Sequence, residues 1–245
     1  MSKFFLEVPG ESDRLRIFCF PYAGGGASIY RNWNTYFKPG MKCYPIQLPG
    51  RENRISDIPY KEMDKLVDDV VSALLPYLNT NYILFGHSMG AKIACEVAAA
   101  LEQYNHVQNP CHLIVAGSQA PHIPDPNPLH NLPEDKFIEG IKKYSGMSEE
   151  FLENKELMKL FMPLFRADFV LDETYAFKKR NFEFPVSALY GSQDEGSEPE
   201  TDESWSEYTN RHYDKKIFKG DHFFIKSQEK EVVQYVCHKI EEYLG

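Results

Sequence analysis

The sequence lacks any long apolar run and any excess of positive charge. No stretch approaches the roughly 18 consecutive apolar residues of a membrane-spanning helix, and the apolar run at residues 4–6 is too short for a signal peptide. The 245 residues carry a formal net charge of −9, whereas nucleic-acid-binding domains usually present a basic face. We therefore expect a soluble, cytoplasmic protein that binds neither a membrane nor nucleic acid.

Cysteine is scarce, and the spacings typical of metal and cofactor sites are missing. The five cysteines form no pair with zinc-site spacing, and no H-E-x-x-H motif is present. The glycines at 24–26 follow a predicted strand, but they lack the Lys-Ser/Thr of a phosphate-binding loop and the spacing of a dinucleotide fingerprint. The sequence predicts buried, reduced thiols, no metal and no cofactor.

What the sequence does contain is an alternation of short apolar strands with amphipathic helices. This alternation predicts a mostly parallel sheet flanked by helices on both faces, within a single α/β domain over residues 1–245. Pro45 indicates an edge or irregular position for its strand. The predicted strands are 15–20, 41–48, 82–85, 112–117, 185–190 and 213–218, and the predicted helices are 29–37, 61–78, 91–104, 201–210 and 229–244.

One long segment departs from this alternation. Residues 118–133 are rich in Pro, His and Asn and predict a loop, and residues 134–180 are helical in pattern with no strand among them. Pro163 is expected to interrupt this helical run. An insertion of this size between two strands predicts a loop and helical lid over the active site at 118–180. A packing subdomain without a gating role is the alternative.

The segment from Gly86 to Gly90 reads Gly-His-Ser-Met-Gly and fits the G-x-S-x-G nucleophile elbow. In such an elbow the strand and the following helix approach so closely that only glycine fits on either side of the serine. The positive end of the helix then points at any developing oxyanion. Five residues alone recur by chance in about one chain in ten of this length, so the motif needs partners elsewhere in the chain.

Those partners follow later strands. Asp194 comes after the strand at 185–190, and His222 comes after the strand at 213–218. The carboxyl ends of parallel strands meet at one edge of a sheet, and the chain order Ser, Asp, His is that of the α/β-hydrolases. We predict that Ser88 is the nucleophile, His222 its general base and Asp194 the residue that orients His222.

Two backbone N–H groups are predicted to stabilise the oxyanion. One belongs to Met89, directly after the nucleophile, and the other to Ala23 in the glycine-rich loop after the first strand. The alternative for the Ala23 loop is a plain flexible connection.

Several other side chains compete for the same roles. His87 adjoins Ser88, but its side chain should diverge at the elbow, and His122 and His130 lie in the Pro-rich loop. Glu195 is the closest competitor of Asp194. Asp221 adjoins His222, although adjacent side chains rarely face each other.

Seven segments together resemble the type II thioesterases of nonribosomal peptide and polyketide synthesis, which are α/β-hydrolases. In chain order they are FPYAGGGAS at 20–28, QLPGR at 47–51, GHSMG at 86–90, LFRADF at 164–169, ETY at 173–175, GSQD at 191–194 and GDHFF at 220–224. The resemblance implies an α/β-hydrolase fold with a helical lid and the triad Ser88, Asp194 and His222. It also implies removal of stalled or wrong acyl or aminoacyl groups from the 4′-phosphopantetheine arm of carrier proteins, which would be the partners.

Some features leave alternatives open. The segment after Asp194 is more acidic than expected for this family, with five acidic residues among 195–203. Docking of an acidic carrier is expected to use Arg31, Arg51, Lys92 or lysines of the insertion. The apolar residues 161, 162, 165 and 169 line the acyl pocket or form the core of the insertion. Acyl transfer, general ester hydrolysis and non-catalytic carrier binding are the alternative functions.

Overall fold

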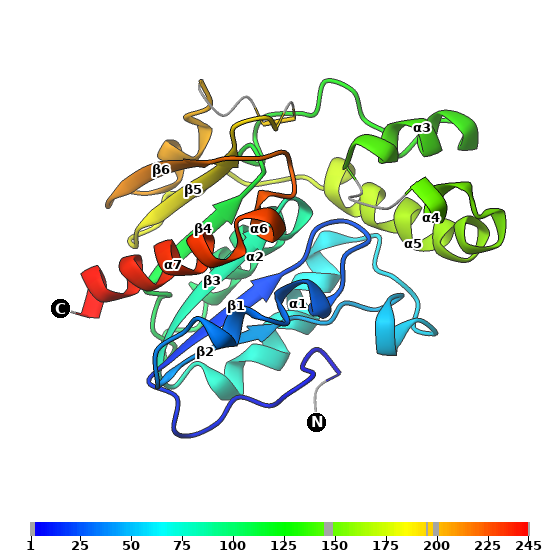
Figure 1. Ribbon diagram of the computed structural model, residues 1–245. Coiled ribbons are helices and arrows are strands. Elements are labelled where there is room, and N and C mark those ends of the chain that lie inside the picture. The colour runs from blue at the N-terminus through cyan, green and yellow to red at the C-terminus, as the bar shows by residue number, and fades with distance from the viewer. Residues whose placement is uncertain (1–2, 145–148, 195, 198–200, 245) are drawn as a thin grey trace.

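The computed structural model describes residues 3–144, 149–194, 196–197 and 201–244. Its centre is a six-stranded sheet in the order β2-β1-β3-β4-β5-β6, in which every pair of neighbouring strands is parallel (Figure 1). Strand β2 lies at one edge, as Pro45 predicts. The strands are β1 Leu15–Phe20, β2 Met41–Pro45, β3 Asn81–His87, β4 His112–Ala116, β5 Val186–Gly191 and β6 Tyr213–Phe218.

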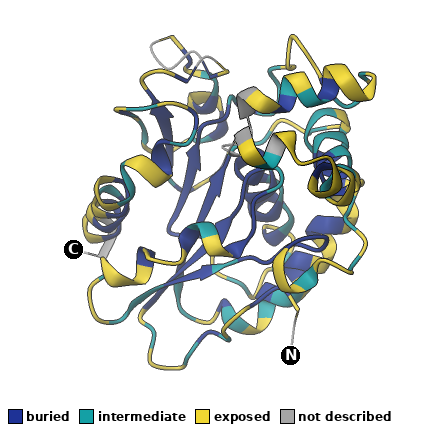
Figure 2. Ribbon diagram, turned by 45° about the vertical axis from the view of Figure 1, so that its right-hand side comes forward, coloured by how far each residue is buried: buried dark blue, intermediate teal, exposed yellow. Residues whose placement is uncertain are grey.

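Helices cover both faces of the sheet because successive side chains of each strand point to opposite sides. In β1, Phe18 and Phe20 pack in the cluster that contains the buried sides of α1 and α2. Ile17 and Cys19 pack in a second cluster with α7. These helices are α1 Met63–Leu74, α2 Met89–Leu101 and α7 Glu229–Leu244. The predicted α/β class is confirmed, and Figure 2 shows the buried sheet between the more exposed outer surfaces of the helices.

The structure corrects several predicted element boundaries. The helices predicted at 29–37 and 201–210 are short 3-10 turns, Ala27–Tyr30 and Trp33–Thr35 in the first case and Ser204–Tyr208 in the second. The predicted strand 41–48 ends at Pro45, because the chain then turns to the N-terminal segment: Ile46 bridges Phe5. A short helix at residues 224–227, α6, has no counterpart among the predictions.

The insertion is a separate group of helices beside one end of the sheet (Figure 1). It consists of α3 Glu134–Tyr144, α4 Glu149–Glu153 and α5 Lys155–Thr174. Contrary to prediction, Pro163 does not interrupt α5: its ring is exposed, while buried residues on both sides of it hold the helix against its neighbours. The predicted helical run to 180 is also wrong. The chain leaves the helix at Tyr175, whose side chain packs on the main core.

The insertion has a small apolar core of its own. Its buried members are Leu129, Phe137, Ile141, Met158 and Phe165. No helix among the described residues is long and apolar enough to cross a membrane.

Candidate active site

Ser88 occupies the sharp turn between β3 and α2. Its backbone has φ +56° and ψ −121°, a conformation that a non-glycine residue rarely adopts. A Cβ at Gly86 would lie 2.0 Å from the carbonyl oxygen of Gly90, and a Cβ at Gly90 would lie 2.2 Å from that of Phe20. Both glycines are therefore required by close backbone approach, as the elbow motif predicts. The Ser88 N–H donates to the carbonyl of Ala116 in β4 over 2.8 Å, which fixes the turn to the sheet.

The structure brings Asp194 and His222 together beyond the ends of β5 and β6. The Nδ1 atom of His222 lies 3.0 Å from Oδ2 of Asp194, and both side chains are buried. Two backbone bonds of 2.8 Å tie the loops that carry them, from Ser192 N–H to the Phe218 carbonyl and from Gln193 N–H to the Gly220 carbonyl. The pair is thus held by backbone geometry as well as by its own contact.

The environment of Asp194 favours the ionised carboxylate. Burial would raise the pKa of Asp194, but the hydrogen bond and charge of His222 and the N–H of Gly196 lower it, so the net pKa lies below its ordinary value. An ionised Asp194 accepts a hydrogen bond from the protonated Nδ1 of His222. The other ring nitrogen, Nε2, is then the unprotonated, basic one.

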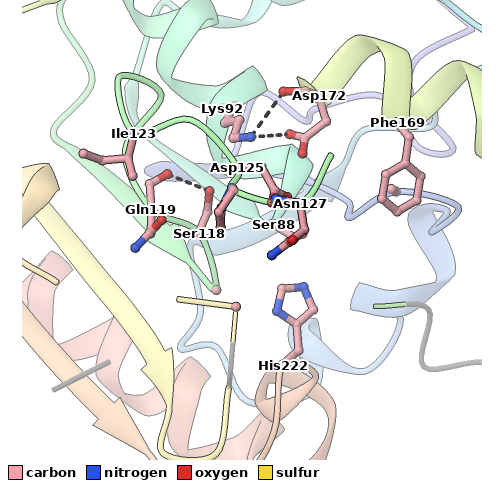
Figure 3. Close-up of a pocket in the computed structure, with 14 residues that line it drawn as sticks. Ser88, Lys92, Ser118, Gln119, Ile123, Asp125, Asn127, Phe169, Asp172 and His222 are labelled. Carbon is pink, nitrogen blue, oxygen red and sulfur yellow. Dashed lines mark hydrogen bonds and ion pairs between the residues drawn. The ribbon is translucent and has the colours of Figure 1, made fainter. Parts of the chain in front are cut away.

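Ser88, His222 and Ala23 line one pocket of about 190 Å³. In Figure 3 the His222 ring is directed toward the part of this pocket that holds Ser88. Helix α5 supplies a wall through Phe169 and Asp172. Much of the remaining lining is polar: Lys92, Ser118, Gln119, Asp125 and Asn127.

A cross-helix ion pair closes one side of the pocket. Lys92 of α2 lies 3.0 Å from Oδ1 of Asp172 in α5, and it also donates to the Asp172 backbone carbonyl over 3.2 Å (Figure 3). Of the four apolar residues predicted at 161, 162, 165 and 169, Phe169 lines the pocket and also packs against the core of the insertion. Phe161, Met162 and Phe165 pack in the core of the insertion instead.

The loop that carries Ala23 is held in place rather than flexible. The N–H of Gly24 donates to Oδ2 of Asp168 over 2.7 Å, and the N–H of Gly25 donates to the Tyr22 carbonyl over 2.9 Å. Met89 is the first residue of α2, directly after Ser88. Of the two predicted oxyanion donors, Met89 therefore adjoins Ser88 and Ala23 lines the pocket. Their catalytic role stays a prediction.

The competing histidines make other contacts or are held neutral. His87 is fully buried with its ring centroid 5.1 Å from that of His222, and burial lowers its pKa well below the ordinary value, so it is neutral. The ring of His122 stacks on Tyr208. The Nδ1 atom of His130 lies 2.7 Å from Glu173.

Asp221 accepts the N–H of Phe223 in its own loop, and its side chain is exposed. Glu195 lies outside the described residues, as do three other residues of the acidic segment, 198–200.

Two of the cations expected to dock a carrier are engaged inside the protein. Arg51 is 3% exposed and forms a salt bridge with Asp168, and Lys92 is paired with Asp172. Arg31 is exposed. The expectation for Arg51 is wrong because this side chain is buried against α5, whose position on the sheet domain no local pattern reveals. Lys92 is partly buried and lines the pocket, and its role in docking stays a prediction.

Sequence reasoning also missed Asp168 and Asp172 as functional contacts. They are four residues apart on α5, so they share one face of the helix. That face also carries the buried Leu164 and Leu171. Charged residues within an apolar stripe are the signal that could have indicated them. Over the described ranges, no group of three or more His, Cys, Asp or Glu side chains is placed to hold a metal ion.

The chain is similar to known proteins over nearly its whole length. The gramicidin S biosynthesis protein GrsT of Aneurinibacillus migulanus is 37% identical over 98% of this chain and 94% of its own length. The solved structure of RedJ, a thioesterase from the prodiginine pathway of Streptomyces coelicolor, is 31% identical and superposes with a TM-score of 0.85 over 96% of this chain and 90% of that one.

A second solved structure, the type II thioesterase YbtT of the yersiniabactin pathway, is 27% identical with a TM-score of 0.85 over 98% of both chains. The thioesterase domain family matches residues 15–242. This chain therefore belongs to the thioesterase domain family, and its predicted resemblance to the type II thioesterases is confirmed.

Proposed function

We propose that this thioesterase hydrolyses stalled or incorrect acyl and aminoacyl groups from the 4′-phosphopantetheine arm of carrier proteins in nonribosomal peptide or polyketide synthesis. The observation that carries the proposal is the strained Ser88 elbow, which opens into a pocket that is also lined by His222, the hydrogen-bond partner of the buried Asp194. The relatives named for gramicidin S biosynthesis and for the yersiniabactin NRPS/PKS pathway support the substrate class.

The proposed mechanism uses Ser88, His222 and Asp194 as a triad. His222 removes the proton of the Ser88 hydroxyl while Oγ attacks the thioester carbonyl, and Asp194 stabilises the imidazolium. The N–H groups of Ala23 and Met89 bind the tetrahedral oxyanion. Collapse breaks the C–S bond, and His222 returns its proton to the departing thiolate. Water, deprotonated by His222, then releases the free acid and restores Ser88.

We also propose that the chain is one domain and that residues 118–180 act as a lid over the site. Supporting observations are the separate apolar core of the insertion and its contribution of Phe169 and Asp172 to the pocket wall. A slender phosphopantetheine arm could pass beneath such a lid while the folded carrier stays outside.

The test is incubation with carrier domains loaded with different acyl and aminoacyl groups, followed by intact mass of the carrier and identification of the released product. Free acid together with the unloaded carrier is the expected result, and the Ser88→Ala variant is expected to leave the carrier loaded. Release as an ester or amide would instead identify an acyltransferase. If the protein neither unloads any carrier nor reacts with a fluorophosphonate, it is a non-catalytic binder and the proposal fails.

A further inference from the structure

A buried ion pair joins the insertion to the sheet domain beside the proposed oxyanion hole. Arg51 and Asp168 are 3% and 1% exposed, and they meet in a bidentate arrangement with two N–O distances of 2.8 Å. Arg51 also donates to the backbone carbonyls of Pro49 and Gly25, each over 3.1 Å. The QLPGR and LFRADF segments of the sequence are thus parts of one contact.

Asp168 reaches the loop that carries Ala23 directly. Its Oδ2 atom accepts the N–H of Gly24 over 2.7 Å. The bond from Gly25 N–H to the Tyr22 carbonyl closes a turn over residues 22–25, in which Gly24 has φ +77°. A positive φ at this position is the mark of a type II turn. Glycine would also permit the type I turn, in which the central peptide is flipped.

The Asp168 carboxylate selects between these two turns. It can accept the N–H of the Ala23–Gly24 peptide, but it would repel the Ala23 carbonyl oxygen that a flipped peptide would turn toward it. The ring of Phe165 packs against the same peptide, since a Cβ at Gly24 would lie 2.3 Å from it. Helix α5 therefore fixes the turn by one hydrogen bond and one packing contact.

The charge of Asp168 also needs Arg51. A lone carboxylate next to the Ala23 turn would oppose the negative charge that develops on the oxyanion, and buried charges interact strongly. The bidentate guanidinium offsets that charge and holds the carboxylate in one orientation. The pair can thus supply a fixed acceptor for Gly24 without an uncompensated negative charge.

We propose that Asp168, held by Arg51, is a positioning residue for the reaction. By fixing the Ala23–Gly24 peptide it anchors the 22–25 turn, and it thereby holds Ala23, whose own N–H belongs to the preceding peptide, in place on the pocket that Ser88 lines. This inference rests on the proposed role of Ala23. It makes the geometry of the oxyanion hole depend on the placement of α5, a helix of the insertion.

The test compares Asp168→Ala and Asp168→Asn with a matched control, Glu173→Gln. Glu173 is another buried carboxylate of α5 that accepts backbone N–H groups, those of Leu129 and His130. Within the described part of the chain, its hydrogen bonds and ion pairs go to these two residues and not to the 22–25 turn. Two quantities are measured for each folded variant: kcat and KM for thioester hydrolysis, and the rate of Ser88 labelling by a fluorophosphonate, whose reaction needs no carrier.

For Asp168→Ala we expect kcat and the labelling rate to fall about 10²-fold, with KM changed by less than about threefold because substrate binding is retained. Asp168→Asn should recover part of the loss, since its amide oxygen can still accept the Gly24 N–H. Glu173→Gln should lose thermal stability and keep kcat. If Asp168→Ala proves insoluble, Asp168→Asn is compared with Glu173→Gln instead, and a selective loss of kcat and labelling is again expected.

The inference is overturned if the Asp168 variants lose no more kcat and labelling rate than Glu173→Gln, or if only KM rises. Failure of the proposed function looks different. In that case the wild-type protein is labelled at Ser88 but cleaves no carrier thioester, and the labelling rates of the variants alone decide the role of Asp168.

Discussion

Ser88 combines a reactive side chain with a strained backbone. Its φ of +56° costs a non-glycine residue on the order of 1–3 kcal/mol. We expect Ser88→Ala and Ser88→Gly to lose activity equally, with kcat lower by on the order of 10⁶-fold. Ser88→Gly should be the more stable of the two by about 1 kcal/mol, because glycine adopts this conformation without strain. Urea unfolding of both variants measures the difference, and equal stabilities would contradict the strain.

Asp194 is expected to act through His222. Replacement by Asn keeps the shape of the side chain but removes the charge and favours the wrong imidazole tautomer, so kcat should fall by about 10⁴-fold. Steady-state kinetics with a loaded carrier measures this loss. A variant that stays within tenfold of wild type would show that another acid orients His222. Glu195 would be the first residue to substitute in that case.

His112 should make stability depend on pH. It is buried with Nε2 2.7 Å from the Ser187 hydroxyl, and burial lowers its pKa to about 4. An unfolded histidine titrates near 6.5, so the unfolded chain takes up a proton between about pH 6.5 and 4 while folded His112 stays neutral. The resulting stability is complete above pH 6.5 and is lost as the pH falls through this window.

The corresponding variant is His112→Gln, which cannot take up this proton. Between pH 7 and 4.5 the free energy of unfolding of the wild type should fall by about 2.5 kcal/mol more than that of the variant. Urea titrations at several pH values give both curves. Parallel curves would mean that folded His112 titrates normally.

Among the elements, α5 tolerates a proline in its interior. Pro163 lacks an N–H and normally costs an interior helix position about 3 kcal/mol relative to Ala. Because its side chain is exposed, Pro163→Ala should remove this cost without disturbing a packed contact. We expect a gain of up to about 3 kcal/mol, seen as slower hydrogen exchange in α5 and a higher Tm. Unchanged exchange in residues 155–174 would contradict this expectation.

The elements differ in how well the sequence predicts them. The strands before Ser88 and Asp194 are predictable because each is a short apolar run followed by a loop. The strand before His222 is an edge strand with three charged residues in its middle, and it is indicated by its place in the alternation of strands and helices. The parallel order brings the three loops to one edge. The turn at 29–37 was misassigned because its aromatic residues face the core with a helix-like spacing. The Arg51–Asp168 pair joins distant segments of the chain. It depends on where α5 lies, which no local periodicity encodes.

At the scale of the whole molecule, we expect chemical modification of the five buried cysteines to measure how often the fold opens. All are reduced and buried, and burial raises the pKa of Cys19, Cys95 and Cys237, which suppresses the reactive thiolate. Cys237, at 9%, is the most exposed of them. We expect iodoacetamide to modify Cys237 first and the other four together, at the rate of global opening. Intact mass over time shows the steps, and several early adducts in the folded protein would contradict this expectation.

The neighbouring strands β4 and β5 are separated in the chain by the whole insertion. They pair directly, Leu113 with Val186, yet about 70 residues lie between the end of one and the start of the other. At a synthesis rate of roughly 5–20 residues per second, a ribosome would present β2, β1, β3 and β4 for several seconds before β5 emerges. During that interval the apolar β4 has an open edge, the kind of surface that recruits other chains. The yield of folded protein in a cell should therefore depend on translation speed across the insertion.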